Sequence, residues 1–220
     1  MKLSRRIGAY GGTFDPIHIG HIEIARAVVE YFALDCLLLI PAYKPPHKRL
    51  AAISQASHRF EMASLVFQDE PRINVSRIEL DAPERPYTVQ TMQHLQEEYG
   101  EESQLFFVMG ADSFEEITMW RDYQQLLSRF NTLVVTRPGS EVTFSHLPSA
   151  AQERVIDLRG KRQEIAAMIH EEDGFIYLTD FVTNSVSSTE IRRRVRDGES
   201  IKGLTTPAVV GYIEEHKLYL

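Results

Sequence analysis

The sequence predicts an α/β fold with a doubly wound, mainly parallel sheet and C-terminal helices. Apolar runs of strand length alternate with segments of helical period along most of the 220 residues, which is the pattern of parallel strands joined by helices. The chain is 43% hydrophobic and 25% charged, and its length is sufficient for one core of ordinary size. We therefore expect residues 1–220 to form a single domain.

The first half of the chain contains three expected strands, each followed by an expected helix. The first helix is amphipathic, because Ile22, Ala25 and Val29 fall on one face. Cys36, the single cysteine, has no partner for an internal disulfide and is expected to be a buried strand residue. The expected strands are 5–10, 35–41 and 72–80, and the expected helices are 20–32, 57–68 and 87–99.

The second half continues the alternation less regularly. Two helices are expected at its end, and the last begins at Thr206 and Pro207, an N-cap followed by proline at the first helical position. Residues 138–173 are treated as at most an insertion or subdomain. With strands in the order 3-2-1-4-5, a nucleotide would bind where the order reverses, beside the first and fourth strands. The expected strands are 104–109, 131–136 and 174–179, with a short helix carrying Trp120 between the first two.

The charge balance excludes some partners. Lys and Arg number 24 against 31 Asp and Glu, so the net charge of −7 disfavours a general nucleic-acid binder but leaves room for a local cationic pocket. The longest apolar run is far shorter than the ~20 residues of a membrane-spanning helix, and the N-terminus lacks the apolar region of a signal peptide. We expect a cytoplasmic protein with neither membrane nor nucleic acid as a partner, and self-association stays open.

Residues 11–21 (GGTFDPIHIGH) follow the first strand and open the first helix. Gly11 and Gly12 allow close approach of a ligand to the backbone, and the helix N-terminus suits a phosphate. His18 and His21 can aim two imidazoles at one place. The glycine spacing fits neither a P-loop ATPase nor a dinucleotide dehydrogenase. Two alternatives remain, a zinc site without an evident third ligand and histidines that merely cap the helix.

A second candidate anion site lies at residues 186–192 (VSSTEIR). Ser187 and Glu190 form the S-x-x-E pattern of a capping box, so a helix is expected to begin there. Arg192, one turn further, can lean back over the helix tip because helical side chains point toward the N-terminus. Taken alone, a capped helix with an arginine is common. Arg193 and Arg194 are assigned to a solvated face.

Together these two segments resemble the two signatures of the HxGH nucleotidyltransferase superfamily, the second with Val186 in place of Ile. Within it the chain is similar to the bacterial nicotinate-mononucleotide adenylyltransferases over essentially its whole length, also through residues 41–48, 87–91, 110–113 and 136–139 and Trp120. The resemblance implies a Rossmann-like nucleotidyltransferase fold. It also implies adenylyl transfer from ATP to nicotinate mononucleotide, giving deamido-NAD and pyrophosphate in NAD biosynthesis, with Mg²⁺ bound through the substrate phosphates and no metal held by the protein alone.

The resemblance assigns roles to individual residues. Three of these assignments have a structural alternative: Asp112 as a helix N-cap, Trp120 as a packing residue, and Lys44, His47 and Lys48 as part of an exposed basic loop. Thr88 is expected to cap a helix, whose N-terminus would suit a carboxylate. The implied catalytic residues are His18, His21 and Arg192; the ATP-binding residues are Gly11, Gly12, Thr13, Phe14, Gly110, Asp112, Ser187, Ser188 and Thr189; and the residues for nicotinate mononucleotide are Lys44, His47, Tyr87, Thr88, Trp120 and Arg137.

Competing functions stay open. An adenylyltransferase of the same superfamily could act on nicotinamide mononucleotide or on phosphopantetheine, although the phosphopantetheine enzymes are typically shorter chains. A class I aminoacyl-tRNA synthetase core would need a KMSKS-type loop and a longer chain. A non-catalytic nucleotide-binding regulator on the same scaffold would have no need to keep both signatures.

Overall fold

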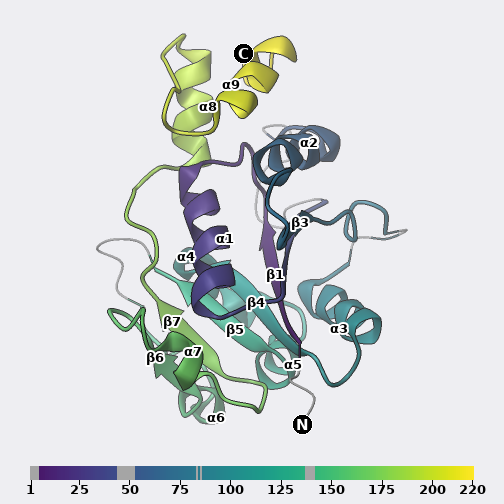
Figure 1. Cartoon of the computed structure of the whole chain (residues 1–220), viewed down its shortest axis with the longest axis vertical. Coiled ribbons are helices and arrows are strands. Elements are labelled where there is room, and N and C mark those ends of the chain that lie inside the picture. The colour runs from purple at the N-terminus through teal and green to yellow at the C-terminus, as the bar shows by residue number, and fades with distance from the viewer. Residues whose placement is uncertain (1–4, 44–52, 83, 85, 137–141) are drawn as a thin grey trace.

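The described part of the chain forms one parallel sheet in the strand order β3-β2-β1-β4-β5-β7-β6, shown in the computed structural model of Figure 1. The structure describes residues 5–43, 53–82, 84, 86–136 and 142–220. Every pair of neighbouring strands is parallel. The strands are β1 (Arg6–Gly12), β2 (Cys36–Pro41), β3 (Ile73–Val75), β4 (Gln104–Gly110), β5 (Asn131–Val135), β6 (Val155–Asp157) and β7 (Ile176–Thr179).

Helices cover both faces of the sheet, so the doubly wound prediction is confirmed. Side chains of β1 and β4 alternate between two apolar clusters, with Tyr10 and Phe106 in one and Ile7 and Phe107 in the other. The first cluster contains residues of α1 (Ile19–Tyr31), α2 (Ala56–Phe67), α7 (Ile165–Met168), α8 (Ser188–Arg196) and α9 (Pro207–Glu215). The second contains residues of α3 (Thr88–Tyr99), α4 (Ala111–Glu115), the 3₁₀ helix η2 (Ile117–Met119) and α5 (Tyr123–Arg129), with α6 (Ser149–Gln152) packed beside it.

The order 3-2-1-4-5 expected from the sequence is present, and β7 and β6 extend it. The order reverses at β1, so the crossovers from β1 and β4 leave toward opposite faces of the sheet. The carboxyl ends of these two strands therefore frame the entrance to the site. The final helix begins as predicted, because the Oγ1 of Thr206 accepts a hydrogen bond from the N–H of Val209 at 3.4 Å.

Several local predictions are wrong. The third strand ends at Val75, because the chain turns just after it. In this turn the Arg77 side chain pairs with the Asp81 carboxylate, and the Arg77 carbonyl accepts the N–H of Asp81. Trp120 lies between η2 and α5 rather than in a helix. Cys36 is only partly buried, since its strand begins there.

The irregular segment 138–173 adds a strand that its composition did not indicate. Residues 155–157 form β6, which pairs in parallel with β7 at the edge of the sheet. An edge strand has only one neighbour, and the residues of β6 are partly buried or exposed, so its sequence carries a weak apolar pattern. Over the described ranges, no helix is long and apolar enough to cross a membrane.

Candidate active site

Two cavities open side by side at the carboxyl ends of β1 and β4. The first, about 350 Å³, is named here the histidine cavity because His18 and His21 line it, together with the tip of α8. The second, about 460 Å³, is named the tryptophan cavity because it contains Trp120. The two cavities share a wall, so ligands bound in them would meet there. The shared wall consists of Gly11, Gly12, Thr13, Gly110, Asp112 and Ser113.

The two histidine rings are stacked, with centroids 3.7 Å apart and planes 25° from parallel. His18 is the N-cap of α1 and is 2% exposed. Its backbone N–H donates to Nδ1 of His21 at 3.3 Å. Because Nδ1 of His21 accepts, a neutral His21 ring carries its proton on Nε2 and can donate from there. The His21 ring therefore does cap the start of the helix by accepting the backbone N–H of His18, as the alternative held. Both imidazole rings nevertheless also line the cavity.

The glycines around the histidines make room for the protein's own rings. A Cβ on Gly20 would lie 3.2 Å from the His18 ring, so this glycine leaves space for that imidazole. A Cβ on Gly12 would lie 2.6 Å from the ring of Phe14, which is buried and meets His21 edge to face at 5.0 Å. By contrast, a Cβ on Gly110 would meet nothing within 4 Å. Of these three, only Gly110 faces open cavity space.

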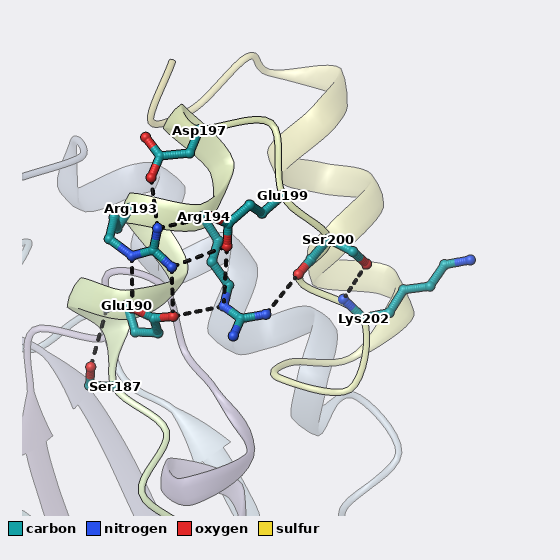
Figure 2. Close-up of polar contacts among 8 residues, drawn as sticks. All are labelled: Ser187, Glu190, Arg193, Arg194, Asp197, Glu199, Ser200 and Lys202. Carbon is teal, nitrogen blue, oxygen red and sulfur yellow. Dashed lines mark hydrogen bonds and ion pairs between the residues drawn. The ribbon is translucent and has the colours of Figure 1, made fainter.

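The tip of α8 forms the far side of the histidine cavity. Ser187 is the N-cap, and its Oγ accepts the N–H of Glu190 at 3.2 Å, as predicted. The reciprocal half of the capping box is absent, because the Glu190 carboxylate accepts from Arg193 and Arg194 instead (Figure 2). These hydrogen bonds lower the pKa of Glu190 to about 2. Arg193 and Arg194 therefore lie on an exposed face, as expected, where they take part in a surface ion-pair cluster.

Arg192 connects the two sequence signatures. It leans back over the helix tip, as expected, and its Nη2 donates to Oγ1 of Thr189 at 3.3 Å. Its Nη1 donates to the backbone carbonyl of Asp15 at 2.7 Å, and the side chain is 18% exposed. Beside it, Oγ of Ser188 donates to the carbonyl of Pro16 at 3.0 Å. Arg192 is not part of the histidine-cavity wall in this conformation.

The sequence predictions do not include the buried carboxylate of Asp15 in the first loop. The Asp15 carboxylate accepts from the Tyr219 hydroxyl at 2.7 Å and from the N–H of Ser54 at 3.3 Å. Burial and the Asp15 charge raise the pKa of Tyr219. Arg59 is buried and donates to the carbonyls of Thr13, Tyr43 and Ser54. Burial lowers the pKa of Arg59, and the Asp15 charge opposes that shift.

One signal could have identified Arg59. It occupies the same helical face as Met62 and Ala63, at the i+3 and i+4 spacing of a buried stripe. A charged residue on an apolar face requires partners, and here these are the carbonyls of the first loop and its surroundings.

The tryptophan cavity has an exposed rim. The indole of Trp120 meets Phe107 edge to face at 6.1 Å, and the Arg121 guanidinium lies 5.1 Å from the centroid of the Tyr87 ring. Tyr87 is 45% exposed and Met119 65%. Thr88 also lines this cavity.

The capping prediction for Thr88 and the capping alternative for Asp112 are both wrong. Tyr87, not Thr88, is the N-cap of α3, and its N–H donates to Oε1 of Gln90 at 2.9 Å. Thr88 is the first helical residue, because the Gln90 side chain reaches back to the N–H of Tyr87 and so makes Tyr87 the cap. Gly110, not Asp112, is the N-cap of α4, and Asp112 lies in the wall shared by both cavities.

Other site predictions cannot be compared with the structure. Lys44, His47, Lys48 and Arg137 lie outside the described residues. Within the described residues, no three or more His, Cys, Asp or Glu side chains are grouped so that they could hold a metal ion, so the zinc alternative finds no support there.

Comparisons with known proteins agree with this geometry. The cytidylyltransferase-like family model matches residues 9–194. A protein of Thermoanaerobacter sp. (strain X514), named "Probable nicotinate-nucleotide adenylyltransferase", is 36% identical over 219 residues, which are 100% of this chain and 96% of the relative. A protein of the same name from Citrifermentans bemidjiense is 38% identical over 218 residues, 98% of each chain.

A solved structure supports the same fold. The Plasmodium falciparum nicotinic acid mononucleotide adenylyltransferase complexed with NaAD superposes with a TM-score of 0.73 at 18% identity, covering 98% of this chain and 97% of that chain. At this identity the likeness concerns the fold, whereas the family follows from the full-length relatives. This chain belongs to the cytidylyltransferase-like family and, within it, to the nicotinate-nucleotide adenylyltransferases.

Proposed function

We infer that the protein transfers the adenylyl group of ATP to nicotinate mononucleotide and releases pyrophosphate. The observation that carries this inference is the pair of cavities with one shared wall, a histidine pair and helix tip on one side and an aromatic rim on the other. Such an arrangement can hold two anionic reactants with their phosphates facing each other. The full-length relatives carry the name of the same reaction.

In the proposed reaction, a phosphate oxygen of nicotinate mononucleotide attacks the α-phosphorus of ATP in line. The new bond joins that oxygen to the α-phosphorus, and the bond to the bridging oxygen of the β-phosphate breaks, so pyrophosphate leaves with the electron pair. The attacking phosphate is already ionised near neutral pH and needs no general base. Catalysis then consists of positioning and stabilisation of charge, without a covalent enzyme intermediate.

We assign ATP phosphate binding to the histidine cavity. Nε2–H of His21 can donate to a phosphate oxygen, and His18 stacks on it, so the two rings act on neighbouring oxygens as charge grows on the leaving group. Ser187, Ser188 and Thr189 at the α8 tip, with the positive end of the helix dipole, would hold the pyrophosphate end. Arg192 would support that end by fixing the helix tip to the first loop and by its charge.

We assign nicotinate mononucleotide to the tryptophan cavity. The flat, electron-poor pyridine ring suits the face of Trp120, and the N-terminus of α3 near Tyr87 and Thr88 suits the nicotinate carboxylate, which the neutral amide lacks. Gly11, Gly12, Thr13, Phe14, Gly110 and Asp112 would contact ATP from the first-loop side and the shared wall. Lys44, His47 and Arg137 remain proposed contacts to the mononucleotide.

We propose Mg²⁺ as the metal that accompanies ATP. Mg²⁺ is usually held by substrate phosphates with one or two carboxylates, and Asp112 in the shared wall is a carboxylate of the fitting type. The ion would neutralise phosphate charge during transfer.

The decisive experiment measures pyrophosphate release by the purified protein with ATP, Mg²⁺ and each acceptor. Nicotinate mononucleotide is expected to give the largest kcat/KM, with nicotinamide mononucleotide lower and phosphopantetheine inactive. Equal or faster turnover of the amide would reassign the substrate. ATP binding without pyrophosphate release from any acceptor would instead identify a nucleotide-binding regulator.

A further inference from the structure

Three consecutive carbonyls of the first loop accept hydrogen bonds from side chains late in the chain. Arg192 donates to the carbonyl of Asp15 at 2.7 Å, Ser188 to that of Pro16 at 3.0 Å, and Thr205 to that of Ile17 at 2.8 Å. The first two donors belong to the second signature. Thr205 does not; it lies in residues 197–206, which we name the α8–α9 connection.

The α8–α9 connection holds both neighbours of His18. The Oγ1 of Thr205 donates to the carbonyl of Ile17, on one side, and the carbonyl of Leu204 accepts the N–H of Ile19 at 3.0 Å, on the other. Thr205 is 4% exposed, and its hydrogen bond to Ile17 is buried. A buried hydrogen bond is not readily exchanged for water, so it constrains the backbone more than a surface contact would.

The connection is itself tied to α8 by the ion-pair cluster of Glu190, Arg193, Arg194, Asp197 and Glu199 (Figure 2). Arg193 bridges from the helix to the Asp197 and Glu199 carboxylates at 2.7 and 3.0 Å, and Arg194 donates to the carbonyl of Ser200 at 3.3 Å. Single exposed ion pairs contribute little, but several shared among five side chains restrict the path of this short segment.

We propose that Thr205 is a positioning residue for adenylyl transfer, whose hydroxyl orients His18 by holding the carbonyl of Ile17. The proposal rests on the proposed function in treating His18 as a phosphate-binding group. Loss of the hydroxyl leaves the Ile17 carbonyl without this donor in a buried place, and the backbone at His18 gains freedom. Because small misplacement of a catalytic group can lower turnover by up to about 10²-fold, the effect belongs in kcat.

The test compares Thr205→Val, which replaces the hydroxyl by a methyl group of similar size, with Thr205→Ser, which keeps the hydroxyl. The neighbouring substitution Thr206→Val is the matched control, because it removes the cap of α9 but no contact to the first loop. For each purified variant, kcat, both KM values and Tm are measured. For Thr205→Val we expect kcat to fall at least tenfold, with each KM changed by no more than about threefold. Thr205→Ser should keep most of the native kcat. Thr206→Val should have a lower Tm but an unchanged kcat.

The proposal is overturned if Thr205→Val turns over like Thr206→Val at matched folded concentration, or if Thr205→Ser is as impaired as Thr205→Val. If Thr205→Val does not fold, Thr205→Ala and Thr205→Ser form a second pair that differs by the hydroxyl, and a kcat ratio near one overturns the proposal. His18→Ala is assayed alongside. Full activity of His18→Ala contradicts the proposed function itself, whereas its loss together with normal Thr205→Val turnover removes only the role of Thr205.

Discussion

The histidine cavity and the tryptophan cavity differ in how their walls are held. Around the histidine cavity, hydrogen bonds from Arg192, Ser188 and Thr205, the last of them buried, fix successive carbonyls of the first loop. Around the tryptophan cavity, the rim carries the exposed side chains of Tyr87 and Met119. Bond-changing chemistry requires preorganised groups, whereas a recognition surface can adjust to its ligand. Substitutions in the first cavity should therefore lower kcat, and substitutions in the second should raise KM.

The largest effect is expected for His18→Ala. It removes one of the two stacked rings, so charge on the leaving pyrophosphate loses a stabilising group, and kcat should fall by roughly 10²–10³-fold. Steady-state pyrophosphate release gives kcat, and circular dichroism checks the fold. A rise in KM for the mononucleotide with unchanged kcat would contradict the expectation that the histidine cavity determines kcat and the tryptophan cavity determines KM.

The shared wall allows a second contrast, between Gly12→Ala and Gly110→Ala. A Cβ on Gly12 would collide with the buried ring of Phe14, so Gly12→Ala should lose about 1–3 kcal/mol of unfolding free energy. Gly110→Ala meets nothing within 4 Å and should keep its Tm while weakening nucleotide binding. Thermal unfolding and ATP titration measure the two quantities. Equal destabilisation of the two variants would show that Phe14 does not require Gly12.

On the tryptophan side, Trp120→Ala should raise KM for nicotinate mononucleotide roughly tenfold, as loss of one base-stacking aromatic does. The KM for ATP should change less than twofold. Met119→Ala is the control at the same rim, since that side chain is already exposed. Parallel increases in both KM values would mean that Trp120 supports the fold through Phe107 instead.

The smallest effect should come from Asp173, which contacts Asn131 at the amino end of β5, whereas both cavities lie at the carboxyl ends of the strands. Burial raises the pKa of Asp173 to about 6, and a hydrogen bond from Asn131 opposes this. Between pH 4 and 6 the folded protein therefore holds a proton that the unfolded chain has released, so stability falls as pH rises through this window. Asp173→Asn removes this pH-dependent loss of stability, because the amide does not titrate. Its Tm relative to the native protein should rise by a few degrees (~2–4 °C) from pH 4 to pH 7, with kcat unchanged. A constant difference in Tm across this range would contradict the assignment.

Local patterns predicted the elements of the site better than its internal contacts. The Ser187 cap and the backward lean of Arg192 depend on residues within one helical turn, so spacing alone predicted them. Arg59, Tyr219 and Thr205 act on the first loop from distant positions, and no local pattern indicates which oxygen of the loop each one reaches. The N-cap of α3 lies one residue before the predicted Thr88, where the side chain of Gln90 closes the helix start, and that of α4 lies two residues before the alternative, Asp112.

The hydrogen bonds that hold the first loop have a consequence for the order of assembly during synthesis. Residues 15–17 contact partners that follow them by 172 to 204 positions. At roughly 5–20 residues per second, a ribosome needs about 10–40 s to add that length of chain. The loop is therefore synthesised well before the side chains that hold it. Nascent chains that have already formed β1 and β2 should remain unable to retain a nucleotide until Tyr219 has left the ribosome.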